Sequence, residues 1–189
     1  MMLKLQVIIC STRPGRVWPA VGGWMHEQAV RHGQFDVELV DLADFKLPVY
    51  DEPNHPRTGK YEHEHTKRWS ESVKRADAFV FVTPEYNFSA PAPLLNALTY
   101  LYHEWTYKPV GFASYGGVSG GMRGVQMTKQ VVTTLKMVPI QEAVTITLIA
   151  QHIDKATGAF TPDEKHPKAA HAMLDELLKW ATALRTMRA

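Results

Sequence analysis

The sequence predicts an α/β fold in which helices cover both faces of a five-stranded, mostly parallel sheet. Apolar segments with the length of strands alternate along the chain with segments of helical periodicity, and this alternation is typical of parallel sheets. Three of the apolar segments are continuous, as in strands that are buried on both faces. With 189 residues, 45% of them hydrophobic, the chain can bury the core of one such domain, which we expect to span residues 1–189.

Each predicted strand has a composition that favours extended backbone. Three of them are the continuous apolar runs LKLQVIIC, ADAFVFVT and PVGFAS, and the last is rich in β-branched residues. In chain order the predicted strands are 3–10, 35–40, 76–83, 109–114 and 138–149.

The predicted helices differ in polarity. The segment 61–75 is charged and amphipathic, whereas 94–105 is apolar on nearly every side, which predicts burial on more than one side. The last helix carries an apolar stripe formed by Met173, Leu174, Leu177, Trp180, Ala181 and Leu184. In chain order the predicted helices are 16–32, 61–75, 94–105, 122–135 and 169–187. Proline, glycine or polar residues predict loops at 42–59, 84–93, 116–121 and 152–167.

Right-handed crossovers leave few arrangements of such a sheet. For a domain of this size we expect the strand order 2-1-3-4-5 of a flavodoxin-like three-layer sandwich. Ligands of these sheets bind beyond the carboxyl ends of the strands, where the strand order reverses, here between the first and third strands. The loops after the first, third and fourth strands should therefore meet at one site. They read STRPGR, TPEYNFSAP and SYGGVSGG.

The first of these loops has the residues of a phosphate site. Ser11 and Thr12 offer hydroxyl groups, Arg13 and Arg16 offer guanidinium groups, and a predicted helix begins here. The N–H groups and the macrodipole at a helix N-terminus favour an anion, and arginine adds planar donors that suit phosphate. We therefore predict that this loop binds a phosphate group; the alternative is a solvated surface turn.

The other two loops favour a flat heteroaromatic ligand. Pro84 and Pro91 stiffen the second loop, and Tyr86 and Phe88 place large rings where a connecting loop is usually polar. The alternative is that both rings only cover the end of the sheet or a subunit interface. The third loop has four glycines in eight residues, which would let its backbone approach a ligand closely.

A first alternative to this site is a nucleophilic cysteine. Cys10 and Arg16 have the C-x5-R spacing of a cysteine-dependent phosphatase, in which a thiolate attacks phosphate. Low-molecular-weight tyrosine phosphatases, however, have Ser or Thr after the arginine and an Asp-Pro general acid. This chain has Val17 at that position and no Asp-Pro, so we interpret Cys10 as a small buried apolar residue.

A second alternative is a nucleophilic serine, because GVSGG at 117–121 matches the G-x-S-x-G elbow around Ser119. Hydrolases of that type need an acid and a histidine at the ends of later strands. Only one predicted strand follows Ser119, and the available partners lie in a polar loop or on the last helix: Asp154, Asp163, His166 and His171. A Ser–His–Asp triad is therefore a strained interpretation.

Composition sets bounds on partners and compartment. The net charge of +2 is too small to predict nucleic-acid binding. No apolar segment reaches the length of a membrane span, and the first residues lack a signal-peptide cleavage site, so we expect no membrane association. The single cysteine excludes an internal disulfide and fits a reducing, cytoplasmic location.

Taken together, the three loops resemble those of the NADPH-dependent FMN reductases, a flavodoxin-like family that includes quinone, azo-dye and chromate reductases. The resemblance runs from about Leu5 to Leu135 and rests on STRPGR, TPEYNFSAPAPLLNAL and KPVGFASYGGVSGGMRGVQ. It implies an oxidoreductase that passes a hydride from NADPH or NADH through bound FMN to a small acceptor such as a quinone, flavin, azo dye or metal oxyanion. It also implies a homodimer or homotetramer, for which the apolar helix at 94–105 would supply the interface.

The resemblance also implies roles for single residues. The FMN phosphate would be held by Ser11, Thr12, Arg13, Arg16, Val17 and Trp18. The isoalloxazine ring would be lined by Pro84, Glu85, Tyr86 and Asn87 and, at its other edge, by Ser114, Tyr115, Gly116, Gly117 and Gly120. Arg123, just after the glycine-rich loop, is a candidate contact for a phosphate of the nicotinamide cofactor; the alternative is a solvated arginine at the start of a helix. No side chain is predicted to be catalytic, because the flavin would carry the chemistry.

One residue departs from the family pattern, since the position of Cys10 is usually glycine in these reductases. We expect FMN still to fit beside a group as small as a thiol. Two alternatives stay open: a flavin-binding electron carrier or redox sensor without turnover, and a phosphatase that uses Cys10 and Arg16.

Overall fold

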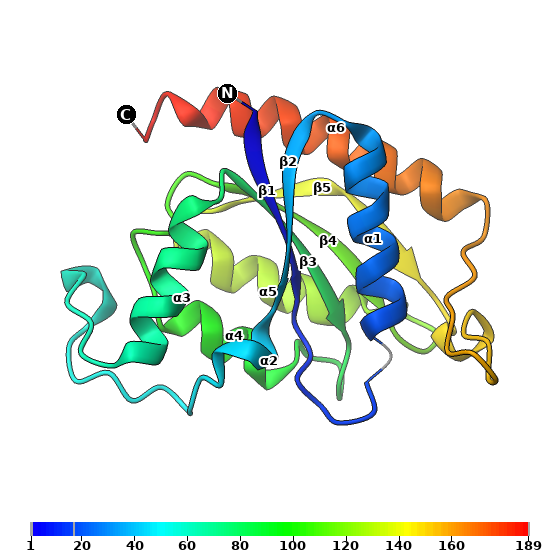
Figure 1. The fold of residues 1–189 in the computed structure, drawn as a ribbon, viewed down its shortest axis with the longest axis horizontal. Coiled ribbons are helices and arrows are strands. Elements are labelled where there is room, and N and C mark those ends of the chain that lie inside the picture. Colours follow the sequence, from blue (N-terminus) through cyan, green and yellow to red (C-terminus); the bar gives the residue numbers. More distant parts are fainter. Residues whose placement is uncertain (1, 17, 189) are drawn as a thin grey trace.

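The computed structural model describes residues 2–16 and 18–188 of the chain. Its centre is a sheet of five parallel strands in the order β2-β1-β3-β4-β5, which confirms the predicted fold class and strand order (Figure 1). The strands are β1 (Leu3–Ile9), β2 (Phe35–Asp41), β3 (Ala78–Pro84), β4 (Pro109–Tyr115) and β5 (Val138–Ile146).

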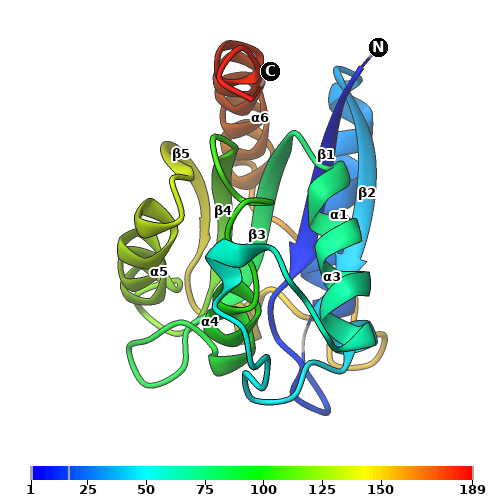
Figure 2. The ribbon, with the colours of Figure 1, turned by 90° about the vertical axis from the view of Figure 1, so that its left-hand side faces the viewer.

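Helices cover both faces of this sheet. They are α1 (Trp18–His32), α2 (Leu42–Phe45), α3 (Glu64–Arg75), α4 (Ala92–Thr99), α5 (Met122–Thr134) and α6 (Lys165–Arg185), and short 3-10 turns lie at Pro56–Thr58 and Ile149–Gln151. Figure 2 shows α3 in front of the sheet and α1 behind it. Helices α4 and α5 contribute to the same core as α3, and α6 contributes to the same core as α1. In the described part of the chain, no helix combines the length and the apolar character that crossing a membrane would require.

The central strands explain the continuous apolar runs of the sequence. Successive side chains of a strand point to opposite faces of the sheet. Phe79 and Phe81 of β3 enter the core under α3, α4 and α5, whereas Val80 and Val82 enter the core under α1 and α6. All four side chains are fully buried. These four successive positions are apolar because both faces of the sheet are covered.

The structure corrects the helix predicted at 94–105. α4 ends at Thr99, and the following turns include Tyr107 with a left-handed φ of 58°. The apolar residues of the segment pack inside the chain itself: Leu94, Leu98, Leu101 and Trp105 are all buried. The ring centre of Trp105, for example, lies 5.0 Å from that of Phe79. Their apolar character is therefore explained by the core of the protomer and does not indicate an interface between subunits.

Two other sequence predictions also change. The predicted loop at 42–59 contains α2, which forms because the Asp41 carboxylate accepts a hydrogen bond from the N–H of Ala43 at 2.9 Å and caps the helix. The last helix begins at Lys165, earlier than predicted, since Pro167 is compatible with the first turn of a helix. Its predicted stripe is buried except for Trp180, which is 40% exposed.

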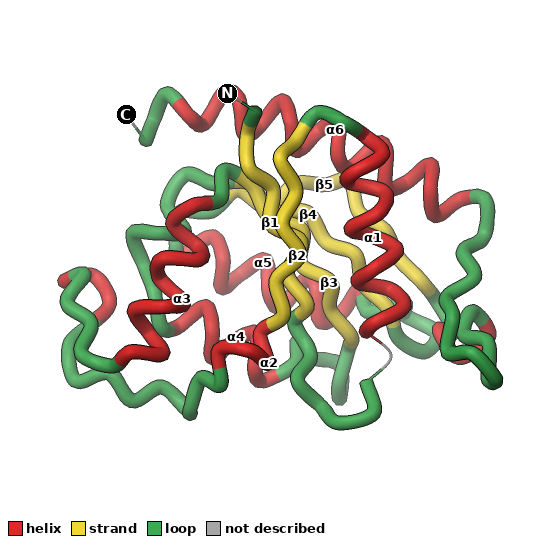
Figure 3. Tube along the Cα trace, in the orientation of Figure 1, coloured by secondary structure: helices red, strands yellow, loops and turns green. Residues whose placement is uncertain are grey.

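The sheet brings the three unusual loops to one edge of the molecule. Because β1, β3 and β4 are neighbours and parallel, their carboxyl ends lie side by side. Figure 3 shows the loops after β1 and β3 together at the lower edge of the view. This edge is where sheets of this order bind their ligands.

Candidate functional site

Side-chain hydrogen bonds connect the three loops beyond the carboxyl ends of β1, β3 and β4. The hydroxyl oxygens of Ser11 and Tyr86 lie 2.8 Å apart and join the first loop to the second. Ser119 Oγ donates to Glu85 Oε1 at 2.9 Å and joins the third loop to the second. The loops therefore form one continuous surface, as their places in the sheet predict.

The first loop, residues 11–16, presents a row of backbone donors. Within the described residues, the N–H groups of Ser11, Thr12, Arg13 and Gly15 donate no hydrogen bond. Gly15 has a left-handed φ of 68°, which glycine adopts without strain. The row lies directly ahead of α1, whose N-terminal dipole favours an anion. These donors fit a phosphate group, which helix N-termini of this kind commonly bind.

The two arginines of this loop differ in their surroundings. The Arg16 guanidinium forms a two-pronged ion pair with Asp41, with Nη2–Oδ2 and Nη1–Oδ1 distances of 2.7 and 3.2 Å, and also donates to the carbonyl oxygen of Ser11. Both side chains of the pair are 12% exposed, whereas Arg13 is exposed to solvent. Arg16 thus holds the loop against the end of β2, and its direct contact with a phosphate stays a prediction.

The second loop contains a tight turn over Tyr86–Ser89. Tyr86 N–H donates to the Ser89 carbonyl at 3.0 Å, and Ser89 N–H donates to the Tyr86 carbonyl at 2.9 Å. The two central residues, Asn87 and Phe88, have left-handed φ angles of 51° and 64°, as in a type I′ turn. Asparagine tolerates this conformation well, but phenylalanine adopts it rarely. Such strain is concentrated at ligand-binding sites.

Phe88 and Arg123 form an exposed pair at the rim of this turn. The Phe88 ring is 66% exposed, and the guanidinium carbon of Arg123 lies 4.1 Å from its centre. A cation above an aromatic face is attracted by the ring. The pair therefore has a defined geometry although both side chains face solvent.

The carboxylate of Glu85 occupies the N-terminus of α5. Its Oε2 accepts hydrogen bonds from the N–H groups of Arg123 and Gly124 at 3.0 and 3.4 Å, and Arg123 Nη1 lies 3.3 Å from Oε1. Burial alone would raise the pKa of Glu85, but the hydrogen bonds from Ser119, Gly124 and Arg123 and the charge of Arg123 hold the pKa below its usual value. The ionised carboxylate thus fills the anion-binding end of α5.

The glycines of the third loop differ in what surrounds them. Gly120 has a left-handed φ of 60°, and a Cβ there would lie 2.5 Å from a methyl carbon of Thr145, so packing requires this glycine. Ser114 Oγ donates to the carbonyl of Gly120 at 2.8 Å and fixes the loop. A Cβ on Gly117, in contrast, would meet no atom within 4 Å. The open space beside Gly117 is where a ligand could approach this backbone.

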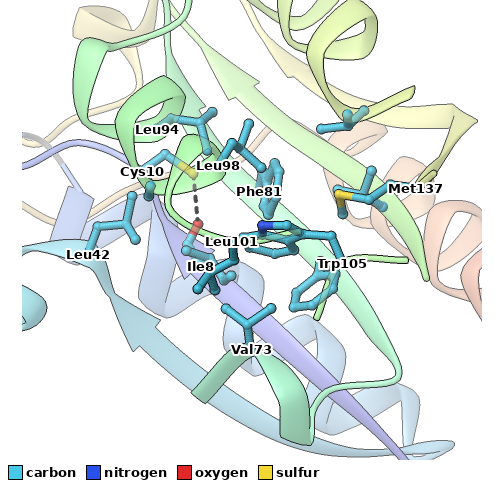
Figure 4. Close-up of a cluster of buried hydrophobic side chains, with 14 of the residues drawn as sticks. Ile8, Cys10, Leu42, Val73, Phe81, Leu94, Leu98, Leu101, Trp105 and Met137 are labelled. Atoms are coloured by element: carbon cyan, nitrogen blue, oxygen red, sulfur yellow. Dashed lines mark hydrogen bonds between the residues drawn. The ribbon is translucent and has the colours of Figure 1, made fainter. Parts of the chain in front are cut away.

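The structure argues against Cys10 as a nucleophile. Its thiol is fully buried in the core beneath α4 and lies 3.3 Å from the carbonyl oxygen of Ile8, to which it donates (Figure 4). Burial, and secondarily the charge of Asp41, raises the pKa of Cys10 well above its usual value. A phosphatase needs an exposed thiolate. The C-x5-R spacing therefore does not assemble a phosphatase site, since Arg16 is engaged by Asp41.

Ser119 is likewise placed for a structural role. Its hydroxyl donates to Glu85, and it is 9% exposed. The candidate triad histidines, His166 and His171, belong to α6, which packs on the opposite face of the sheet from α5. The G-x-S-x-G match is therefore a turn that positions a cap for α5.

The remaining predicted site residues differ in how deeply they are buried. Pro84, Ser114 and Tyr115 are buried at the strand ends, whereas Asn87 and Gly117 are exposed. The pKa of Tyr115 is raised, chiefly by burial and then by Tyr86 and Cys10. Gly116 is half-buried beneath the loop. Val17 lies outside the described residues, and only the backbone of Trp18, at the start of α1, is described.

Sequence reasoning missed two of the contacts that shape this site. It did not pair Asp41 with Arg16, although an acidic residue at the end of β2 is a usable signal. It also did not identify Glu85 as the cap of α5, because the partners of Glu85 are 34 to 39 positions away and no local pattern marks them.

Comparison with known proteins agrees with this geometry. Residues 3–151 match the family model for NADPH-dependent FMN reductases. An NAD(P)H-dependent FMN reductase of Schizosaccharomyces pombe is 46% identical over 76% of this chain and 73% of its own length. A quinone reductase of Pseudomonas putida is 33% identical over 53% of this chain and 55% of its own length. The solved structure of FerB, a flavoenzyme NAD(P)H:(acceptor) oxidoreductase from Paracoccus denitrificans, has the same fold, with a TM-score of 0.73, 22% identity and coverage of 96% of this chain and 98% of that chain.

Replacing Glu85 by glutamine should destabilise the protein, because the amide keeps the shape but loses the charge that faces α5. We expect the free energy of unfolding at pH 7 to fall by about 1–2 kcal/mol, measured by urea denaturation. The folded pKa of Glu85 is depressed, so its contribution is present above the unfolded pKa near 4.5 and is lost as pH falls through the folded pKa. The stabilities of wild type and Glu85→Gln should therefore converge as pH falls from 4.5 through the folded pKa of Glu85.

Glu27→Gln is the matched control for this measurement, since the Glu27 side chain is 63% exposed and only forms a surface pair with Arg31. Its effect should be close to zero at every pH. Equal stability of Glu85→Gln and wild type at pH 7 would show that the carboxylate does not hold α5.

Proposed function

The chain belongs to the NADPH-dependent FMN reductase family, and we propose that it binds FMN where its three loops meet and uses NADPH or NADH to reduce a small acceptor. Bound FMN would supply the redox chemistry, taking a hydride from the nicotinamide cofactor and passing electrons to the acceptor. The protein's part is to bind, orient and expose the flavin. The observation that carries this proposal is the row of N–H groups at residues 11–15, ahead of α1, which donate no hydrogen bond to any described residue and lie beside two further loops of the family pattern.

The phosphate of FMN is proposed to lie in the first loop. The N–H groups of Ser11, Thr12, Arg13 and Gly15 supply neutral donors, and the exposed Arg13 side chain supplies a charge. Arg16 supports this geometry indirectly, because its ion pair with Asp41 holds the first loop against the end of β2. Trp18 would contribute through its backbone at the start of α1.

The isoalloxazine ring is proposed to lie between the second and third loops. Pro84, Glu85, Tyr86 and Asn87 would line one edge, and Ser114, Tyr115, Gly116, Gly117 and Gly120 would line the other. The tight turn after Tyr86 keeps backbone N–H groups exposed at Asn87 and Phe88, which donate no hydrogen bond within the described residues. A rigid turn with exposed donors suits the polar edge of a flat ring.

The face of the flavin away from the sheet would serve both substrates in turn. Arg123 is proposed to contact a phosphate of the nicotinamide cofactor, because its side chain is 52% exposed and its guanidinium lies over Phe88 at the rim of the site. The acceptor would then take the place of the nicotinamide. A quinone is the acceptor we favour, since one relative of this chain is a quinone reductase; flavins, azo dyes and metal oxyanions are the other candidates.

NADPH titration of the purified, FMN-loaded protein tests the proposed reaction. The protein should be yellow, lose its flavin absorbance on addition of NADPH without oxygen, and oxidise NADPH continuously when a quinone is present. Cys10→Ser should behave in the same way, because the buried thiol does not touch the open side of the loops. Bleaching without turnover would favour an electron carrier, and failure to take up FMN would contradict the proposal.

Arg13→Ala tests the proposed phosphate loop. The loss of a charge-assisted hydrogen bond should raise the Kd for FMN roughly tenfold, measured by flavin fluorescence quenching. The matched control is Arg31→Ala, which removes an exposed arginine at the opposite end of α1 and should leave the Kd unchanged. An unaltered Kd in Arg13→Ala would place the phosphate elsewhere.

We also propose a homodimer or homotetramer, as the family resemblance implies. The residues at 94–105 do not support this proposal, but a cavity of about 600 Å³ between α2 and α4 has apolar residues at its rim, among them Val49, which is 89% exposed. One chain has a mass of 21.3 kDa. Light scattering at micromolar concentration should give twice or four times this mass, and a value for a single chain would refute the proposal.

A further inference from the structure

Two histidines and an aspartate lie together where the end of α1 passes α6, away from the three loops (Figure 1). His32 is the last residue of α1, and His171 and Asp175 are four positions apart on α6. Residues at this spacing are neighbours on one side of a helix. His171 and Asp175 can therefore both face His32.

The three side chains are already close enough to share one ion. His32 Nε2 lies 3.1 Å from Asp175 Oδ1, and His171 Nδ1 lies 3.0 Å from Asp175 Oδ2. One ligand atom from each residue lies within 4.8 Å of the other two. The His32 side chain is 3% exposed and its ring stacks on Phe35 at 5.9 Å between centres, so its position is fixed by packing.

We propose that His32, His171 and Asp175 bind one Zn²⁺ ion. Zinc takes imidazole nitrogen and carboxylate oxygen at about 2.0–2.2 Å in a tetrahedral arrangement, which places ligand atoms roughly 3.3–3.5 Å apart. The two nitrogen–oxygen separations, 3.1 and 3.0 Å, are slightly shorter than this range and involve different oxygens of Asp175, so a small rotation is needed for both imidazoles to share an ion with one oxygen. Rotation of the His171 side chain, which is 67% exposed, would shorten the distance between His32 Nε2 and His171 Nδ1.

The surroundings of the cluster support a cation with one open position. The carbonyl groups at the end of α1 carry partial negative charge, which favours a cation beside His32. A cavity of about 550 Å³ lies next to the cluster, so a water molecule can complete the coordination. Arg31 and Lys168 also border this cavity and oppose a cation, but the Arg31 guanidinium lies 3.5 Å from the Glu27 carboxylate.

The buried Nδ1 atom of His32 limits the affinity. It has no hydrogen-bond partner among the described residues. When Nε2 coordinates zinc, the ring proton moves to Nδ1, and tight zinc sites provide an acceptor for that N–H group. We therefore expect a Kd in the micromolar range, weaker than that of a dedicated structural zinc site.

Calorimetric titration of the FMN-loaded protein with ZnCl₂, after removal of metals by a chelator, tests this site. Wild type should bind one Zn²⁺ per chain, and the Kd should rise at least tenfold in His171→Ala and in Asp175→Asn. Because the ion would join α1 to α6, it binds only the folded chain and should raise the Tm of wild type but not of His171→Ala. Circular dichroism of each variant checks that it is folded.

Two further variants separate this cluster from other histidines of the chain. His152→Ala removes a ligand from a second group, formed with Asp163 and His166, and His55→Ala removes an isolated exposed histidine. Both should bind zinc as wild type does. Three results would overturn the proposal. They are loss of zinc binding in His152→Ala, unchanged zinc binding in His171→Ala, and no binding by wild type at a zinc concentration 100 times the expected micromolar Kd.

Discussion

The buried carboxylate of Glu85 is the interaction on which the shape of the candidate site depends. It starts from the end of β3, accepts hydrogen bonds from the first turn of α5 and from Ser119, and so ties the second loop to the third. An ionised group in such a place is stable only because these donors compensate its burial. Glu85 also places a negative charge at the N-terminus of α5, where it interacts favourably with the helix dipole.

A second ion pair gives the two arginines of the first loop different roles. Asp41 stands at the end of β2, next to β1 in the sheet, and takes the charge of Arg16. The pair is 12% exposed on each side, and it neutralises two charges that would otherwise be costly at this depth. Without Asp41, Arg16 would add a full positive charge beneath the loop. With it, the loop keeps its geometry and Arg13 carries the charge that faces solvent.

These contacts also show what could be predicted from the sequence. The strand order and the meeting of the loops were predictable, because continuous apolar strands and right-handed crossovers leave few arrangements. The length of α4 was not, since an apolar segment can be buried by a second subunit or by its own chain, and Trp105 is buried by its own chain. The ion-pair partner of Arg16, Asp41, and the partners of Glu85 are 25 or more positions away. Periodicity is a local signal, so it cannot report such pairs.

The ionisable groups beneath the loops indicate what kind of chemistry this site can support. Burial raises the pKa of Cys10 and of Tyr115, so both stay neutral near pH 7, and hydrogen bonds keep Glu85 ionised and occupied. None of these three groups is poised to exchange a proton near neutral pH, as a general acid or base must be. Hydride transfer through a flavin needs no such group from the protein. The loops are therefore better suited to positioning a reactive cofactor than to attacking a substrate, and the same burial that excludes a phosphatase is compatible with a reductase.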